Sequence, residues 1–131
     1  MKQVLDIKQM QHLQELGLDT SNASMAWCKY DGEKENSHLL PKEECVFERC
    51  LVVKYVPAYT LQDVLELLPS SVNWNRLLIT FNGCECIFQY ALYENDPICS
   101  FFNEETIDAA YEMLCWCIEN RYLKTEKENV R

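Results

Sequence analysis

Glycine is scarce in this 131-residue sequence, which contains only three glycines and four prolines. Glycine-rich nucleotide-binding loops need several glycines close together, because their backbone must approach a phosphate closely. Here Gly17, Gly32 and Gly83 are far apart. The HExxH, GxSxG and EF-hand patterns are also missing. The sequence therefore gives no support to nucleotide-binding, zinc-protease, serine-hydrolase or calcium-binding function, and no cofactor is expected.

Basic residues are nearly absent from the second half of the fold. Residues 55–120 contain ten acidic residues and one base, Arg76, whereas the rest of the chain has eleven of each; the whole chain has a net charge of −9. An acidic surface repels phosphate backbones, so direct binding of nucleic acid is disfavoured. Such a surface either attracts a basic partner protein or only keeps the protein soluble.

Long hydrophobic runs are also missing. No stretch approaches the roughly 18 apolar residues that a membrane-spanning helix needs. The first residues, MKQVLDIKQMQHLQELG, contain no apolar run of signal-peptide length. We therefore expect no membrane association and a cytoplasmic location.

Cysteine, in contrast, is abundant, with eight residues. In a cytoplasmic protein, reduced thiols that pack as small hydrophobic side chains are expected. Cys84 and Cys86 are two residues apart, so on a strand they would share a face. A zinc site is the alternative, with further ligands from His38, Cys45 or Cys99, although the paired spacing usual in structural zinc sites is missing.

Capping residues and apolar spacing predict three helices. Asp6 and Gly17 mark the ends of the first helix, and Thr60 and Pro69 mark those of the second. Asn103 is expected to cap the third helix, with Glu104 and Glu105 in its first turn and an end near residues 120–123.

The remaining apolar segments predict strands, and the Asn82-Gly83 pair predicts an antiparallel hairpin over residues 75–93. The predicted order is α-β-β-α-β-β-α, which indicates an α+β fold with helices packed on a small antiparallel sheet. A single domain is expected over residues 1–131. Within it, residues 31–44 are expected to form a flexible loop and residues 124–131 a frayed, charged tail. The predicted strands cover residues 23–30, 45–56, 75–81 and 84–93, and residues 94–103 are expected to form a loop.

The last helix contains the sequence Cys115-Trp116-Cys117. Residues two apart on a helix point about 200° away from each other, so the two thiols cannot hold one metal ion together. Packing in the core is the expected role of this segment. Ala109, Met113 and Trp116 form a second apolar stripe, which is a candidate homodimer face with Trp116 as its anchor.

The charged and titratable side chains suggest no catalytic site. His12 and His38 are isolated, and the carboxylates of Glu104, Glu105, Asp108 and Glu112 fit a solvated helix face. Because these acids belong to the acidic half, Glu104, Glu105 and Asp108, together with Trp116, are the candidate residues for binding a partner protein.

Three stretches, MQHLQELGLDTSNASMAW, PAYTLQDVLELLP and IDAAYEMLCWCIEN, resemble those of short acidic proteins in prophages and mobile elements of gut Bacteroidetes. The resemblance covers the first helix and strand, the middle helix and the last helix. It implies a mobile-element setting and a cytoplasmic bacterial location, and it implies no activity and no catalytic residues.

The sequence thus favours a non-enzymatic interaction protein, monomeric or homodimeric, that docks a basic partner protein. The alternative is a small metal or thiol protein, or an enzyme, centred on Cys84 and Cys86.

Overall fold

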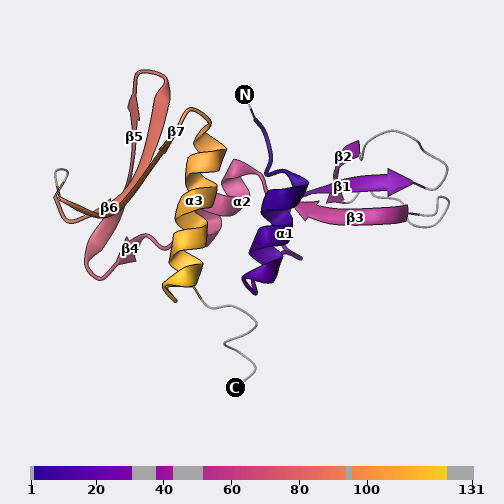
Figure 1. Cartoon of the computed structure of the whole chain (residues 1–131), viewed down its shortest axis with the longest axis horizontal. Coiled ribbons are helices and arrows are strands. Elements are labelled where there is room, and N and C mark those ends of the chain that lie inside the picture. The colour runs from indigo at the N-terminus through magenta and orange to yellow at the C-terminus, as the bar shows by residue number, and fades with distance from the viewer. Residues whose placement is uncertain (1, 31–37, 43–51, 94–95, 124–131) are drawn as a thin grey trace.

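The computed structural model describes residues 2–30, 38–42, 52–93 and 96–123, and these form an α+β fold (Figure 1). In these ranges the chain contains three helices and seven strands, and the strands form two separate antiparallel sheets. The helices are α1 (Ile7–Glu15), α2 (Leu61–Leu67) and α3 (Thr106–Glu119). The strands are β1 (Met25–Tyr30), β2 (His38–Pro41), β3 (Val52–Ala58), β4 (Ser71–Val72), β5 (Asn75–Asn82), β6 (Glu85–Ala91) and β7 (Pro97–Asn103). Figure 1 shows the three helices in the middle of the molecule, with one sheet on either side.

The smaller sheet has the order β2-β1-β3. Trp27 in β1 lies between Leu39 of β2 and Val56 of β3. The indole N–H of Trp27 donates a hydrogen bond to the carbonyl oxygen of Leu5 at 3.1 Å, which ties this sheet to the segment before α1.

The larger sheet has the order β4-β5-β6-β7. Phe88 and Tyr90 of β6 are fully buried, and they belong to the same core cluster as Leu114 and Cys117 of α3. Helix α3 contacts β6 and β7 on one side and α2 on another. Its apolar surface is therefore covered by more than one neighbour, as expected for a helix that is hydrophobic around most of its circumference.

The helix ends of α1 follow from its sequence. The Asp6 side chain accepts a hydrogen bond from the backbone N–H of Gln9, and the Gln9 side chain accepts one from the backbone N–H of Asp6, which completes a capping box. At the other end Gly17 has φ 95°, and the N–H of Leu18 donates to the carbonyl oxygen of Leu13. This is a Schellman C-cap, which needs a residue with positive φ at the glycine position.

The α+β class and the predicted helices α1 and α2 are confirmed. Thr60 is the N-cap of α2 as predicted, and its side chain forms a capping box with Asp63. The prediction of one small sheet with four strands was wrong, because the strands divide between two sheets.

Three strands lie where the sequence predicted none or predicted loop. β2 lies in the predicted 31–44 loop, β4 follows α2, and β7 lies in the segment that was expected to link the hairpin to α3. The predicted 45–56 strand is β3, which extends from Val52 to Ala58 in the described chain; residues 45–51 lie outside the described residues. Of the expected 31–44 loop, the structure describes only residues 38–42. The expected tail, residues 124–131, lies outside the described residues.

The predicted 75–93 hairpin is confirmed as β5 and β6, but its turn is shifted by one residue. Asn82 pairs with Glu85, so Gly83 and Cys84 are the two turn residues. Gly83 has φ 64°, which is typical of the first turn residue of a type II′ hairpin.

The start of α3 also differs from the prediction. The helix begins at Thr106, with Glu105 at the N-cap position and no side-chain capping bond. The Asn103 side chain accepts a hydrogen bond from the backbone N–H of Glu105 at 3.0 Å, so Asn103 shapes the turn before the helix rather than capping it.

Within the described ranges, no helix has the length and apolar character needed to cross a membrane.

Candidate functional site

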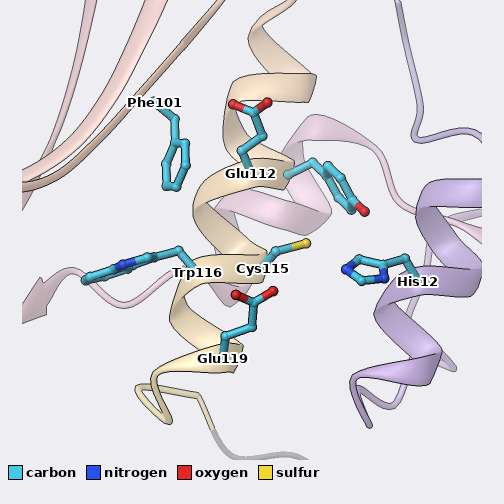
Figure 2. A pocket seen from close by; sticks show the side chains of 7 residues that line it. His12, Phe101, Glu112, Cys115, Trp116 and Glu119 are labelled. Atoms are coloured by element: carbon cyan, nitrogen blue, oxygen red, sulfur yellow. The ribbon is translucent and has the colours of Figure 1, made fainter.

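A groove lies along the outer surface of α3, between α1 and β7 (Figure 2). Its volume is about 330 Å³, which is at the lower end of the range for sites that bind small molecules or side chains. It is lined by His12 of α1, by Phe101 of β7, and by Tyr111, Glu112, Cys115, Trp116 and Glu119 of α3.

The spacing of the α3 residues explains why they share this groove. Glu112, Cys115, Trp116 and Glu119 stand at positions i, i+3, i+4 and i+7, which lie on one face of a helix. Figure 2 shows Cys115 directed toward His12, with Glu112 and Glu119 on either side of it along the helix. The groove therefore combines two carboxylates with aromatic walls.

The aromatic walls are held by packing. Trp116 is half-buried and stacks on Tyr90, with 5.9 Å between ring centroids and 27° between ring planes. The ring of Tyr122, just after α3, packs against Trp116 in a tilted arrangement, with 5.2 Å between ring centroids. On the α1 side, the rings of His12 and Tyr111 form a T-shaped contact with 6.4 Å between their centroids. These contacts fix the rings before any ligand binds.

The carboxylates of the groove have no cationic partner among the described residues. Within the described part of the chain, no basic side chain forms an ion pair with Glu112 or Glu119. Burial raises the pKa of Glu112 above its ordinary value, and the nearby negative charge of Asp108 adds to this effect. The charged form of Glu112 is thus disfavoured where it stands, and a bound cation would relieve this cost.

The thiol at the centre of the groove is not activated. Burial raises the pKa of Cys115 to about 11, and the nearby carboxylates of Glu119 and Glu112 contribute in the same direction, against a hydrogen bond with Tyr111 that lowers it. At neutral pH this thiol is therefore protonated, whereas a nucleophilic cysteine needs a lowered pKa.

Two of the predicted partner-binding acids are engaged inside the chain, beside the groove rather than in it. The backbone N–H of Lys2 donates to a carboxylate oxygen of Glu105 at 3.0 Å, and the Lys2 ammonium donates to Asp108 at 2.8 Å. The amide of Gln9 in α1 also donates to Asp108, at 2.9 Å. This polar cluster connects the N-terminal segment, α1 and α3, and it neutralises part of the acidic surface.

The other two predicted partner-binding residues are in different settings. Glu104 is exposed and precedes α3, whereas Trp116 lines the groove. The second apolar stripe is not an open dimer face, because Ala109 and Met113 are fully buried inside the chain. Of the predicted set, the structure brings only Trp116 into the groove.

Cys84 and Cys86 do not share one environment. Cys84 is exposed in the hairpin turn and Cys86 is buried in β6, because the turn falls one residue later than predicted. Cys99 lies in β7, His38 lies in the other sheet, and Cys45 lies outside the described residues. Within the residues described, no three His, Cys, Asp or Glu side chains are grouped as metal ligands.

The sequence interpretation missed Glu112, Glu119, Phe101 and His12 as site residues. The spacing of Glu112, Cys115, Trp116 and Glu119 was the available signal, but the prediction for this helix rested only on its apolar stripes. Phe101 and His12 could not have been found in this way, since their places depend on how β7 and α1 pack against α3.

In comparisons with protein-family models, with curated proteins and with solved structures, nothing matches this chain. The resemblance to prophage and mobile-element proteins therefore stays a prediction.

Proposed function

We propose that this chain is a small cytoplasmic, non-enzymatic interaction module of a prophage or mobile element, and that its α3 groove binds a basic side chain of a partner protein. The observation that carries the proposal is Glu112, a carboxylate with a raised pKa in an aromatic groove, with no basic partner in the described chain. Glu119, which also lines the groove, has no basic partner there either.

The chemistry of the groove favours an arginine or lysine side chain as the ligand. A cation is attracted to aromatic faces, and it forms charge-assisted hydrogen bonds with carboxylates. Glu112 and Glu119 are seven residues apart, which corresponds to about 10 Å along the helix axis. A guanidinium or ammonium group can enter between them, next to Trp116.

Binding is favoured over catalysis because the groove has no activated nucleophile. The raised pKa of Cys115 keeps its thiol protonated. The alternative site at Cys84 and Cys86 receives no support from their positions, since one thiol is exposed and the other is buried.

Titration with a short peptide tests the proposal. An acetylated Gly-Arg-Gly amide is added to the isotope-labelled protein, and a Gly-Gln-Gly peptide serves as the neutral counterpart. We expect saturable chemical-shift changes at the backbone amides of Cys115 and Trp116 with the arginine peptide only. The affinity should fall as salt is raised, because mobile ions screen the attraction between charges.

Two double variants, each lacking two carboxylates, test whether the peptide binds in the groove. The Glu112→Gln/Glu119→Gln double variant should lose binding, whereas Glu66→Gln/Glu104→Gln, which removes the same charge from exposed positions outside the groove, should keep it. Equal losses in both double variants would show that only the general acidity of the surface attracts the peptide. Equal responses to both peptides would contradict a role for charge.

A further inference from the structure

One edge of strand β5 is largely unpaired in the described part of the chain. The short strand β4 pairs only with Asn75 and Arg76, and one more hydrogen bond runs from the N–H of Leu77 to the carbonyl oxygen of Ser70 at 3.0 Å. Beyond Leu77, no described strand pairs with this edge of β5. Figure 1 shows β5 at the outer side of the larger sheet.

The direction of the backbone groups on β5 follows from its pairing. In an antiparallel ladder, consecutive residues direct their N–H and C=O groups to opposite sides of the strand. Leu77 donates outward, toward Ser70. Ile79 and Phe81 therefore also direct their backbone groups outward, whereas Leu78 and Thr80 bond to β6.

The same two residues have exposed apolar side chains. Ile79 is 39% exposed and Phe81 is 70% exposed, although they lie on the sheet face that α3 covers further along β6. The segment from Leu77 to Asn82 contains no charged residue and no proline. Open hydrogen-bonding groups and exposed apolar side chains thus coincide on an uncharged strand.

The other sheet edges contain features that hinder pairing with another chain. β2 has four residues and ends at Pro41, and β3 contains Lys54 and Pro57. β7 begins at Pro97 and has a register shift in its pairing with β6. Prolines, lysines, bulges and short strands are the usual protection of edge strands. The free part of β5 lacks such protection.

We propose that a second copy of this chain pairs with β5 through its own β5, antiparallel and about a twofold axis near Thr80. The outward N–H and C=O groups of Ile79 and Phe81 would bond to the same groups of the partner subunit. The side chain of Ile79 would then lie beside Phe81 of the partner subunit, a β-branched and aromatic pair that stabilises neighbouring strands.

A second copy is the occupant that this edge fits best. An antiparallel strand pair is self-complementary, and a twofold pair uses both open edges, so the assembly stops at two chains. The net charge of −9 repels a second copy elsewhere on the surface, whereas residues 77–82 are uncharged. The contact is small, with Phe81 contributing on the order of 100 Å², against about 800 Å² per partner in a standard interface. We therefore expect a weak dimer, with a dissociation constant on the order of 100 μM.

Sedimentation velocity of the full chain tests this proposal. The mass should rise from 15.4 kDa toward twice that value as the protein concentration is raised from roughly 10 μM to roughly 1 mM. Added salt should strengthen the dimer, because it screens the repulsion between two acidic chains. The salt dependence of the dimer is opposite to that of the proposed peptide binding, so the dimer proposal and the groove proposal can fail separately.

Two lysine variants of exposed phenylalanines provide the matched comparison. Phe81→Lys should stay monomeric over the whole range, whereas Phe102→Lys, which changes a 61% exposed phenylalanine on β7, should dimerise like the wild type. A wild-type mass of 15.4 kDa at the highest concentration would overturn the proposal. A dimer that survives Phe81→Lys would overturn it as well.

Amide hydrogen exchange gives a second readout that does not depend on a variant. The outward amides of Ile79 and Phe81 should exchange roughly fourfold more slowly at roughly 1 mM than at roughly 10 μM protein, because pairing would protect them and the dimer would hold most of the chains at the higher concentration. The amides of Leu78 and Thr80, already bonded to β6, serve as the internal reference. Exchange at Ile79 and Phe81 that does not depend on concentration would contradict pairing at this edge.

Discussion

The carboxylate of Asp63 accepts two hydrogen bonds from Ser24, one from the backbone N–H at 3.0 Å and one from the hydroxyl at 2.6 Å. The same carboxylate accepts a hydrogen bond from the backbone N–H of Thr60, the N-cap residue of α2. One buried acid thus caps its own helix and connects that helix to the start of β1. It joins segments that are 39 residues apart in the sequence.

Replacing Asp63 with Asn should lower the free energy of unfolding by roughly 2 kcal/mol, because hydrogen bonds to a charged group are stronger than neutral ones and the Asn amide nitrogen cannot accept the N–H groups. Urea denaturation followed by circular dichroism measures this change. Glu66→Gln removes the same charge from an exposed site on the same helix, so it should stay within about 0.5 kcal/mol of the wild type. A similar loss in both variants would contradict the specific role of Asp63.

The contribution of Asp63 should depend on pH. Burial alone would raise the pKa of Asp63, but the hydrogen bonds from Ser24 and Thr60 outweigh burial. The pKa of Asp63 in the folded protein therefore lies below its ordinary value. A lowered folded pKa contributes stability that is present above the unfolded pKa of about 4 and is lost as the pH falls through the folded pKa. The difference in unfolding free energy between the wild type and Asp63→Asn should therefore be constant between pH 5 and 7 and shrink in acid. A difference that grows in acid would contradict this assignment.

Local sequence signals predicted the helices well because the relevant contacts are close in the chain. The capping boxes at Asp6 and Thr60 each join residues three apart, and the 75–93 hairpin closes through a two-residue turn. β4 has only two residues, too few to show alternation, and β7 begins with a proline and pairs, among the described strands, only with β6. The division into two sheets depends on distant packing, which periodicity does not contain.

The groove was only partly predictable for the same reason. Its α3 residues share a helix face by spacing alone, so the sequence does contain that part of the site. Its other walls come from β7 and α1, which are distant in sequence. The engagement of Asp108 by Lys2 joins residues 106 apart, and no local pattern shows that two predicted docking acids already have a partner.

Arg121 ends α3 in a strained conformation, and this predicts a stabilising substitution. Its φ is 64°, and the N–H of Tyr122 donates to the carbonyl oxygen of Cys117, so Arg121 occupies the position that Gly17 holds in α1. A side chain disfavours this left-handed backbone. Arg121→Gly should therefore raise the free energy of unfolding by roughly 0.5–1 kcal/mol, as measured by urea denaturation.

Alanine variants separate the backbone effect from the side chain. Arg121→Ala retains the β-carbon and should change stability by less than about 0.5 kcal/mol. Gly17→Ala introduces a β-carbon and should cost roughly 1 kcal/mol. If Arg121→Ala stabilised as much as Arg121→Gly, the gain would come from loss of the arginine side chain, and the strain argument would be wrong.

The cysteines should differ strongly in reactivity. Cys84 is exposed, whereas Cys115 is buried and burial raises its pKa to about 11. Because the thiolate is the reactive form, iodoacetamide at pH 8 should modify Cys84 at least about 100-fold faster than Cys115. Mass spectrometry of peptides taken over time resolves the two sites. In guanidinium the two rates should converge, and a fast reaction of Cys115 in the folded protein would be inconsistent with its buried position.

Glu112 should oppose folding while it supports binding. Burial and the charge of Asp108 raise its pKa in the folded protein, so ionised Glu112 costs stability at pH values above its folded pKa, and this cost disappears below its unfolded pKa. Glu112→Gln should therefore raise the free energy of unfolding at pH 7 by up to about 1 kcal/mol, since solvent screens part of the effect. The gain should vanish near pH 3.

The same variant should bind the arginine peptide less tightly, so stability and binding should change in opposite directions. Such a trade-off is expected of a residue whose unfavourable charge serves a ligand. Urea denaturation and peptide titration on one preparation of Glu112→Gln measure both quantities, with Glu66→Gln as the control that should change neither. If Glu112→Gln lost stability and binding together, the carboxylate would be a structural group, and the groove would lose the observation on which its proposed role depends.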